Sequence, residues 1–221
     1  MKATRLWVSV MGAWMGLAGI EHGIGEILQG NHAPEGIMIQ SWPGSALFQN
    51  LSGEPALTIL PNLLYTGILA IFFSLLFAAW SVFGAHHPRG GWVLMLLAIP
   101  MLVFGGGIFP PILGFLIGAA ATRIPAAVRL GRPATGFNRL IATKWPCIFA
   151  ACCAAWLALL PGVALLGYYF GIDHTGVILT IIAAAFGLLF LSYRSSIEHD
   201  HIELFQSFKK EKGVLTSANG N

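Results

Sequence analysis

Two glutamates and a histidine lie within six residues of each other near the end of an apolar N-terminal segment, in the stretch "GIEHGIGEILQG" at residues 19–30. These side chains are Glu21, His22 and Glu26. Ionisable groups inside a membrane usually face a protein interior or a cavity rather than lipid. A carboxylate beside an imidazole can exchange a proton or hold a cation near neutral pH, so the stretch predicts a polar site. The alternative for Glu26 is that it only marks the end of a helix at the membrane boundary.

Other polar residues are expected to lie at the same depth in the membrane. Asn62 and Thr66 are four residues apart, so they share a helix face at the start of the second apolar segment. His174 lies just before the last apolar segment. We expect these ends to meet in one pocket that opens on the outer side of the membrane, lined by Glu21, His22, Glu26, Asn62, Thr66 and His174.

A second group of ionisable residues, "EHDHIE", occupies residues 198–203. His199 and Glu203 are one helical turn apart, which makes them candidates to share a metal ion. A His-Glu-x-x-His motif is absent from the sequence, and a solvated polar helix face explains the same residues without a metal. The sequence identifies no cofactor.

Composition decides the class of protein. Hydrophobic residues make up 56% of the 221-residue chain and charged residues only 10%, whereas soluble domains carry about 25% charged residues. The chain lacks the polar surface of a soluble protein, so we predict an all-α, polytopic integral membrane protein of the plasma membrane, with the lipid bilayer as its partner. The basic residues fall in short loops rather than on one basic face, which argues against nucleic acid as a partner.

Four segments are expected to be full membrane spans. A spanning helix needs about 20 mostly apolar residues. The segments that meet this length are residues 6–29, 61–84, 146–170 and 175–193.

The apolar residues 92–121 contain a break, "FGGGIFPP". Glycines weaken a helix and prolines end it, so this segment predicts a hairpin of two short helices. The bundle then has five or six membrane helices, depending on whether the hairpin re-enters the membrane or crosses it twice. Backbone without helical hydrogen bonds must be buried in protein or line a wet cavity at membrane depth. The hairpin apex either packs tightly or presents backbone groups to a substrate, and its residues are Gly105, Gly106, Gly107, Pro110 and Pro111.

The positions of Lys and Arg indicate the orientation of the chain, because cytoplasmic loops are enriched in both residues. If residues 92–121 return to their own side, every Lys and Arg lies on one side of the membrane, together with both termini and the loop at residues 122–145. If the segment crosses once, that basic loop lies outside. We therefore predict the hairpin, with the N and C termini in the cytoplasm.

Glycines recur along the first segment at spacings of three and four residues. Small residues at this spacing allow two membrane helices to approach closely. Glu26 continues the stripe and His22 lies beside it, so both are expected to point toward a neighbouring helix, whereas Glu21 points nearly the opposite way. The helix-packing stripe comprises Gly12, Gly16, Gly19 and Gly23.

The sequence becomes more polar and more charged after Tyr193. Ser195 and Glu198 fit a capping box at the start of a helix. We predict a transmembrane domain at residues 1–193, followed at residues 194–221 by an amphipathic helix on the cytoplasmic surface and a disordered tail.

Three classes of function fit these features. The broken hairpin and the buried carboxylates favour a small transporter or channel with an outward-facing Glu/His pocket. The glycine stripe favours an accessory or structural subunit, assembled as a homo-oligomer or in a membrane complex. The histidines favour a membrane enzyme or a cofactor-binding subunit, although the sequence carries no nucleotide loop, serine-hydrolase elbow, haem-attachment motif or zinc signature. The transporter is the leading hypothesis.

Overall fold

The computed structural model describes residues 2–48, 53–124, 136–171 and 175–218. These parts of the chain are helical apart from one pair of short strands in the connection between the first two helices. In chain order the elements are α1 (Lys2–Gln29), β1 (Met38–Gln40), β2 (Pro55–Leu57), α2 (Leu63–Phe83), α3 (Gly90–Val103), α4 (Phe109–Ala121), α5 (Gly136–Thr143), α6 (Trp145–Leu157), the π-helical turn η3 (Ala158–Gly162), α7 (Val163–Phe170) and α8 (Thr175–Ala218).

Three helical segments among the described residues are long and apolar enough to cross a membrane. They are α2, the continuous segment Trp145–Phe170 formed by α6, η3 and α7, and the Gly176–Lys210 part of α8. The apolar helices α3 and α4 have 14 and 13 residues. At about 1.5 Å per residue they are shorter than the hydrocarbon core of a bilayer, which is about 30 Å thick. The all-helical class is therefore confirmed, with three helical segments that are long and apolar enough to span a membrane.

The helix α1 is not among these three segments, although it is 28 residues long. Arg5 near its start and the pair Glu21 and His22 near its end leave only a short apolar stretch between them. The described residues therefore contain three segments of the required length and apolar character, whereas four full spans were expected from the sequence.

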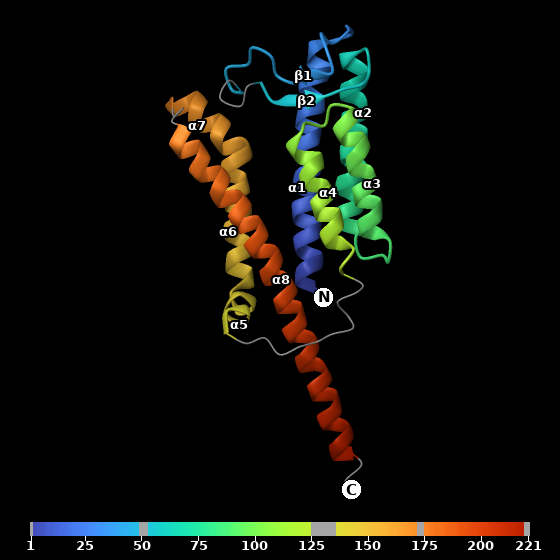
Figure 1. Ribbon diagram of the computed structural model, residues 1–221, viewed down its shortest axis with the longest axis vertical. Coiled ribbons are helices and arrows are strands. Elements are labelled where there is room, and N and C mark those ends of the chain that lie inside the picture. The colour runs from blue at the N-terminus through green and yellow to red at the C-terminus, as the bar shows by residue number, and fades with distance from the viewer. Residues whose placement is uncertain (1, 49–52, 125–135, 172–174, 219–221) are drawn as a thin grey trace.

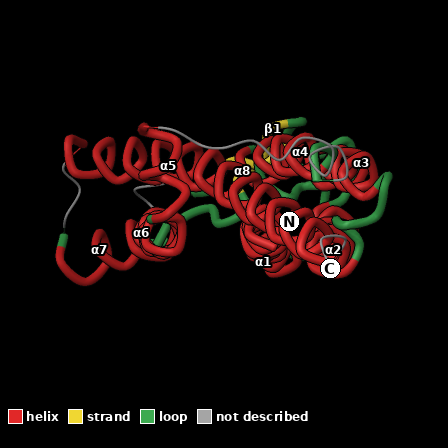
Figure 2. The backbone as a smooth tube through the Cα atoms, turned by 90° about the horizontal axis from the view of Figure 1, so that it is seen from below, coloured by secondary structure: helices red, strands yellow, loops and turns green. Residues whose placement is uncertain are grey.

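The first four helices form a bundle, with α1 packed against both α2 and α4 (Figure 1). The helices α3 and α4 are an antiparallel hairpin whose apex is at residues 104–108. The segment α6–α7 packs against α8 and splays away from the bundle, while α8 crosses back to contact α1. Figure 2, seen from below, shows α6 and α7 to one side of the bundle and α8 crossing between the two parts.

The two ends of the molecule differ in charge. The strands and the hairpin apex lie at one end, which we call the strand end (Figure 1). The start of α1, the α2–α3 turn, the end of α4, α5 and the last part of α8 lie at the opposite end, which we call the basic end. All described Lys and Arg residues belong to these elements of the basic end: Lys2, Arg5, Arg89, Arg123, Arg139, Lys144, Arg194, Lys209, Lys210 and Lys212.

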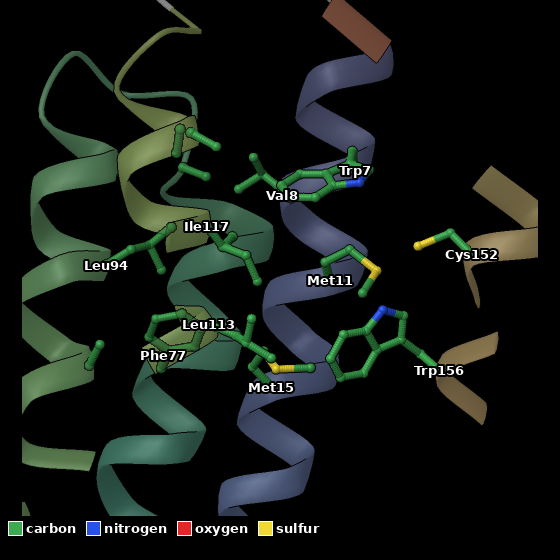
Figure 3. Packing of buried hydrophobic residues seen from close by; sticks show 14 of the residues in the cluster. Trp7, Val8, Met11, Met15, Phe77, Leu94, Leu113, Ile117, Cys152 and Trp156 are labelled. Carbon is green, nitrogen blue, oxygen red and sulfur yellow. The ribbon is translucent and has the colours of Figure 1, made fainter. Parts of the chain in front are cut away.

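The apolar core is centred on α1 (Figure 3). Trp7, Met11 and Met15 of this helix are nearly fully buried. On one side they face Phe77 of α2 and residues of the α3–α4 hairpin, and on the other side Trp156 reaches across from α6. The helix with the ionisable cluster is therefore also the helix to which the bundle and the α6–α8 arm are both attached.

The glycine stripe of α1 lies against α2. A Cβ atom added at Gly16 would lie 2.6 Å from Cβ of Ala78, and one added at Gly19 would overlap Oγ of Ser74. Gly23 faces the backbone of Gly67, so the two helices meet there through a pair of glycines. Because no side chain separates the backbones, α2 lies close beside the face of α1 that also carries Glu26.

The last helix corrects the expectation for residues 194–221. Ser195 does not start a helix, because α8 continues without a break through this position, and its hydroxyl instead donates to the carbonyl of Ile141 at 3.1 Å. The stretch at residues 198–203 is only partly solvated, since Glu198 and Asp200 are buried whereas Glu203 is exposed. The carboxylate of Asp200 accepts the backbone N–H groups of Ala3 at 3.0 Å and Thr4 at 2.9 Å, which satisfies two free donors at the start of α1. The predicted disordered tail is residues 216–221, of which 216–218 belong to α8 and 219–221 lie outside the described residues.

Candidate functional site

The strand pair brings two polar side chains onto the end of α1. The strands β1 and β2 are antiparallel, and their pairing continues beyond the strands, where the N–H of Ser41 donates to the carbonyl of Glu54 at 3.0 Å. Glu54 has a φ of +56°, a left-handed conformation that non-glycine residues adopt rarely. Ser41 and Glu54 are thus held opposite each other by main-chain geometry, and both reach the ionisable residues of α1.

The end of α1 is shaped to accept this strand. The amide of Gln29 donates to the carbonyls of Gln40 and Ser41, each at 3.0 Å. Gly25 allows the approach, because a Cβ atom there would overlap the carbonyl oxygen of Ser41. The glycine and the glutamine of "GIGEILQG" therefore fix where Ser41 lies along α1.

Four side chains form a continuous chain of polar contacts at the strand end. Nε2 of His22 lies 3.4 Å from Oε2 of Glu54, and Nδ1 of His22 lies 2.9 Å from Oγ of Ser41. The Ser41 hydroxyl donates to Oε1 of Glu26 at 3.3 Å. Relative exposure is 3% for His22 and 0% for Ser41 and Glu26, so of these four residues Glu54 is the most exposed to solvent.

The hairpin apex closes over this chain. Gly105 and Gly107 have φ values of +89° and +78°, and a Cβ atom at either position would overlap the Glu26 carboxylate or the His22 ring respectively. The apex is held to the strand end by the N–H of Gly105, which donates to the carbonyl of Leu57 at 2.8 Å. The glycines are therefore required both for the turn and for the close approach to the two ionisable residues.

The two prolines of the break serve the helix that follows. Pro110 and Pro111 lie in the first turn of α4, where backbone N–H groups have no partner within the helix and proline is tolerated. Pro110 also lines the pocket described next.

A pocket of about 590 Å³ lies between α1 and the α6–α8 arm. Its strand end is polar and carries Glu21, His22 and Glu54. The rest of its wall is apolar or aromatic and includes Leu17, Trp14, Phe48, Phe109, Trp156, Leu160 and Phe186. This size and mixture of surfaces are typical of a site for a small organic ligand.

Three polar atoms of pocket-lining residues have no hydrogen-bond partner among the described residues. They are Oε1 of Glu21 and the indole nitrogens of Trp14 and Trp156. Buried polar groups are normally paired. Each of these three atoms exposes less than 1 Å² to solvent, so neighbouring side chains must move before a ligand or a water molecule can reach it.

The wall opposite α1 is irregular. The turn η3 carries Pro161 and interrupts the segment between α6 and α7 where Leu159 and Leu160 face the pocket. Proline lacks the N–H group that a helix needs, which explains the irregular turn. Turns of this kind are frequent at functional sites, and this one lies at the pocket.

The structure divides the six predicted pocket residues. Glu21 and His22 line the pocket, and Glu26 lies behind them with Thr66, next to Gly105. Asn62 does not join this group, because it caps α2 by accepting the N–H of Tyr65 and donates to exposed Asn31. His174 lies outside the described residues.

The residues that sequence reasoning missed come from the long α1–α2 connection. Ser41 offered no signal, because a single serine in "QSWPG" resembles an ordinary turn residue. Glu54 is an acid between Gly53 and Pro55, which is ordinary turn composition, and only the strand pairing brings it to His22.

Burial changes the titration of Glu54. Desolvation raises the pKa of its carboxyl group from 4.5 to about 7. Glu54 is consequently a mixture of protonated and ionised forms near neutral pH.

The candidate metal ligands are a pair on one helix. Nε2 of His199 lies 3.5 Å from Oε1 of Glu203, and Nδ1 of His199 lies 3.0 Å from the carbonyl of Ala142 on α5. Among the described residues, no group of three or more His, Cys, Asp or Glu side chains has the arrangement of a metal site. His199 thus takes part in joining α5 to α8.

These features define a helical protein with membrane-spanning segments and an ionisable cluster at one end of an apolar pocket. Comparison of the chain with family models, with curated proteins and with solved structures found no match.

Proposed function

We propose that this chain is a small membrane transporter that binds apolar organic cations in the pocket between α1 and the α6–α8 arm. The proposal rests on the lining of the pocket, because its wall is mostly apolar and aromatic and has two carboxylates and an imidazole at one end. This corresponds to a ligand with an apolar body and a positively charged centre. The Glu/His cluster thereby becomes the recognition site rather than a structural hydrogen-bond network.

Charge favours a cation over an anion or a neutral lipid. The described lining includes Glu21 and Glu54 and contains no Lys or Arg. A cation placed between the two carboxylates gains attraction in a surrounding of low dielectric constant. Trp14, Trp156 and Phe109 add aromatic faces to the wall, and such faces attract organic cations.

We further propose how the chain lies in the membrane. The basic end faces the cytoplasm and the strand end faces outward, as the excess of Lys and Arg on cytoplasmic sides requires. In this arrangement α1 crosses the plasma membrane within the protein, covered by α2, α4 and α8, and its ionisable residues avoid lipid. The α3–α4 hairpin enters from the cytoplasm and places its apex under the strands.

A pair of probes with the same shape and opposite charge tests the cation proposal. Tetraphenylphosphonium and tetraphenylborate are both bulky and apolar. Purified protein in detergent is expected to bind the cation, with quenching of tryptophan fluorescence from Trp14 and Trp156, and to bind the anion far more weakly. Glu21→Gln keeps the shape of the side chain, removes one charge and is expected to weaken binding of the cation about tenfold.

Glu35→Gln is the matched control, because Glu35 lies exposed in the same α1–α2 connection as Glu54 but does not line the pocket. Equal affinity for the two probes, or equal affinity of the parent and Glu21→Gln for the cation, would overturn the proposal. The accessory-subunit hypothesis would then be preferred.

A further inference from the structure

We infer that Glu54, His22, Ser41 and Glu26 form a proton relay that joins the pocket to an enclosed carboxyl group on α1. The inference rests on the contact chain alone and does not require the cation proposed above. It assigns a proton-binding site to Glu26 and a transfer role to Ser41.

The contact distances place every atom that the relay needs. The links are Glu54 to His22 at 3.4 Å, His22 to Ser41 at 2.9 Å and Ser41 to Glu26 at 3.3 Å. The imidazole has a ring nitrogen facing each neighbour. The hydroxyl oxygen can accept a proton from one neighbour while it gives its own proton to the other. The chain therefore runs without a gap from a pocket-lining carboxyl group to an enclosed one.

Two arrangements of the same heavy atoms differ only in where the protons are. In the first, the Glu54 carboxyl O–H donates to Nε2 of His22, the Nδ1–H donates to Ser41, and the Ser41 hydroxyl donates to the Glu26 carboxylate. In the second, Glu26 carries the proton and donates to Ser41, Ser41 donates to Nδ1, and the Nε2–H donates to the Glu54 carboxylate.

Conversion between the two arrangements is balanced. Three bonds to hydrogen break, at Glu54, at Nδ1 and at Ser41, and three form, at Nε2, at Ser41 and at Glu26. One proton is delivered from Glu54 to Glu26, and the negative charge moves from Glu26 to Glu54. No oxidant, reductant or other reactant is needed.

The surroundings of Glu26 make it the end of the relay. Its Oε2 has no hydrogen-bond partner among the described residues, and Gly105 of the hairpin apex lies directly against the carboxylate. The neighbouring element α2 contributes Thr66, which does not titrate. An enclosed carboxylate without a cation is costly to keep charged, so a proton delivered to this position is retained.

The titratable groups around Glu26 are all accounted for within the described residues. Glu21 and His22 lie on its own helix, and Glu54 comes from the strand pair. The apex contributes glycines, and Ser41, which directly follows β1, carries the transferable hydroxyl proton. Loss of a proton from Glu26 thus has one hydrogen-bonded route, through Ser41.

Infrared spectroscopy of the full chain, without any ligand, tests the relay. A protonated carboxyl group has its own C=O stretching band, and that band shifts when the proton is exchanged for deuterium. At neutral pH the parent is expected to show such a band, retained in Glu21→Gln. The Glu26 component of the band is expected to be lost in Glu26→Gln, where the partly protonated Glu54 leaves a weaker band. Transfer to deuterated buffer is expected to shift the Glu26 component rapidly in the parent and about tenfold more slowly in Ser41→Ala.

Ser74→Ala is the matched control, because Ser74 is also a fully buried serine of the bundle but lies against Gly19, away from the contact chain. Slow exchange in Ser41→Ala with parent-like exchange in Ser74→Ala supports the relay, whether or not Glu26→Gln folds. Equal exchange rates in the two serine variants, or no protonated carboxyl band in the parent at neutral pH, would overturn it. Binding of tetraphenylphosphonium is a separate measurement, so the two proposals fail independently.

Discussion

At the scale of single residues, the site depends on where ionisable groups meet rather than on any motif. Glu26 and His22 are neighbours on α1, but they are linked only by Ser41, which is distant in the sequence. Glu54, whose own backbone has a left-handed conformation, contacts the same imidazole. A conformation of this kind is retained where the surrounding structure imposes it, and here the strand pairing at Ser41 does so.

The titration of Glu54 gives a prediction of stability against pH. Because its pKa is raised from 4.5 to about 7 in the folded protein, the folded state binds more protons than the unfolded state between these values. The free energy of unfolding should therefore fall as pH rises through this window, by at most about 1.4 kcal/mol per pH unit from this group. Glu54→Gln should remove this part of the slope in unfolding measurements from pH 4 to about pH 8. Glu35→Gln should leave the slope unchanged, and a parent-like slope in Glu54→Gln would contradict the assignment.

At the scale of elements, the bundle is organised by glycines. The stripe on α1 brings α2 into backbone contact, and the glycines of the hairpin apex bring α3 and α4 onto the end of the same helix. In lipid, apolar side chains gain little from associating, so close packing of small residues supplies much of the attraction between helices. The same closeness leaves no room for water beside Glu26 on the side of the apex.

Enlarging one of these glycines should weaken the α1–α2 contact. Gly19→Leu is expected to reduce the free energy of unfolding by about 1–3 kcal/mol, because the added side chain overlaps Ser74. Thermal unfolding in detergent measures the effect. Gly187→Leu on α8 is the control, since a Cβ atom there meets nothing within 4 Å. If both variants melt like the parent, the α1–α2 contact is not as tight as described.

At the scale of the whole molecule, the basic residues are separated from the acidic residues of α1 along the long axis. The described Lys and Arg residues belong to elements of the basic end, whereas the end of α1 that carries Glu21 and Glu26 lies at the strand end (Figure 1). The long helix α8 joins the two parts of the molecule, packing on α6 and on α1, and its Asp200 caps the start of α1. An orientation with the basic end in the cytoplasm agrees with the distribution of basic residues in membrane proteins generally.

Single cysteines at the two ends test this orientation. In a background with the three native cysteines replaced by alanine, Gly136→Cys at the start of α5 should react with a membrane-impermeant thiol reagent only after the cells are opened. Gly44→Cys, in the α1–α2 connection, should react in intact cells. Neither glycine has a neighbour within 4 Å of an added Cβ atom, so both substitutions leave the packing intact, although both glycines have positive φ. Labelling of Gly136→Cys from outside would reverse the orientation.

The helical class and the hairpin were predictable because both are local. Membrane helices satisfy their own backbone hydrogen bonds, so hydropathy and the Gly/Pro break of residues 104–111 indicate where they begin and end. The boundary at residue 193 was not predictable in this way. A run of polar residues resembles a new element, but Ser195 and Asp200 are buried by α5 and α1, which only the packing of α8 reveals.

The candidate site shows the same division. Helical periodicity and hydropathy follow from neighbouring residues, so they were sufficient to predict that Glu21, His22 and Glu26 occupy one end of an apolar helix. Which of these side chains contact each other depends on how the elements pack together. Ser41 and Glu54 reach α1 through strand pairing, and Trp156 reaches it from another span. Contacts between residues far apart in the chain depend on the packing of whole elements, and no local pattern of residues encodes that packing.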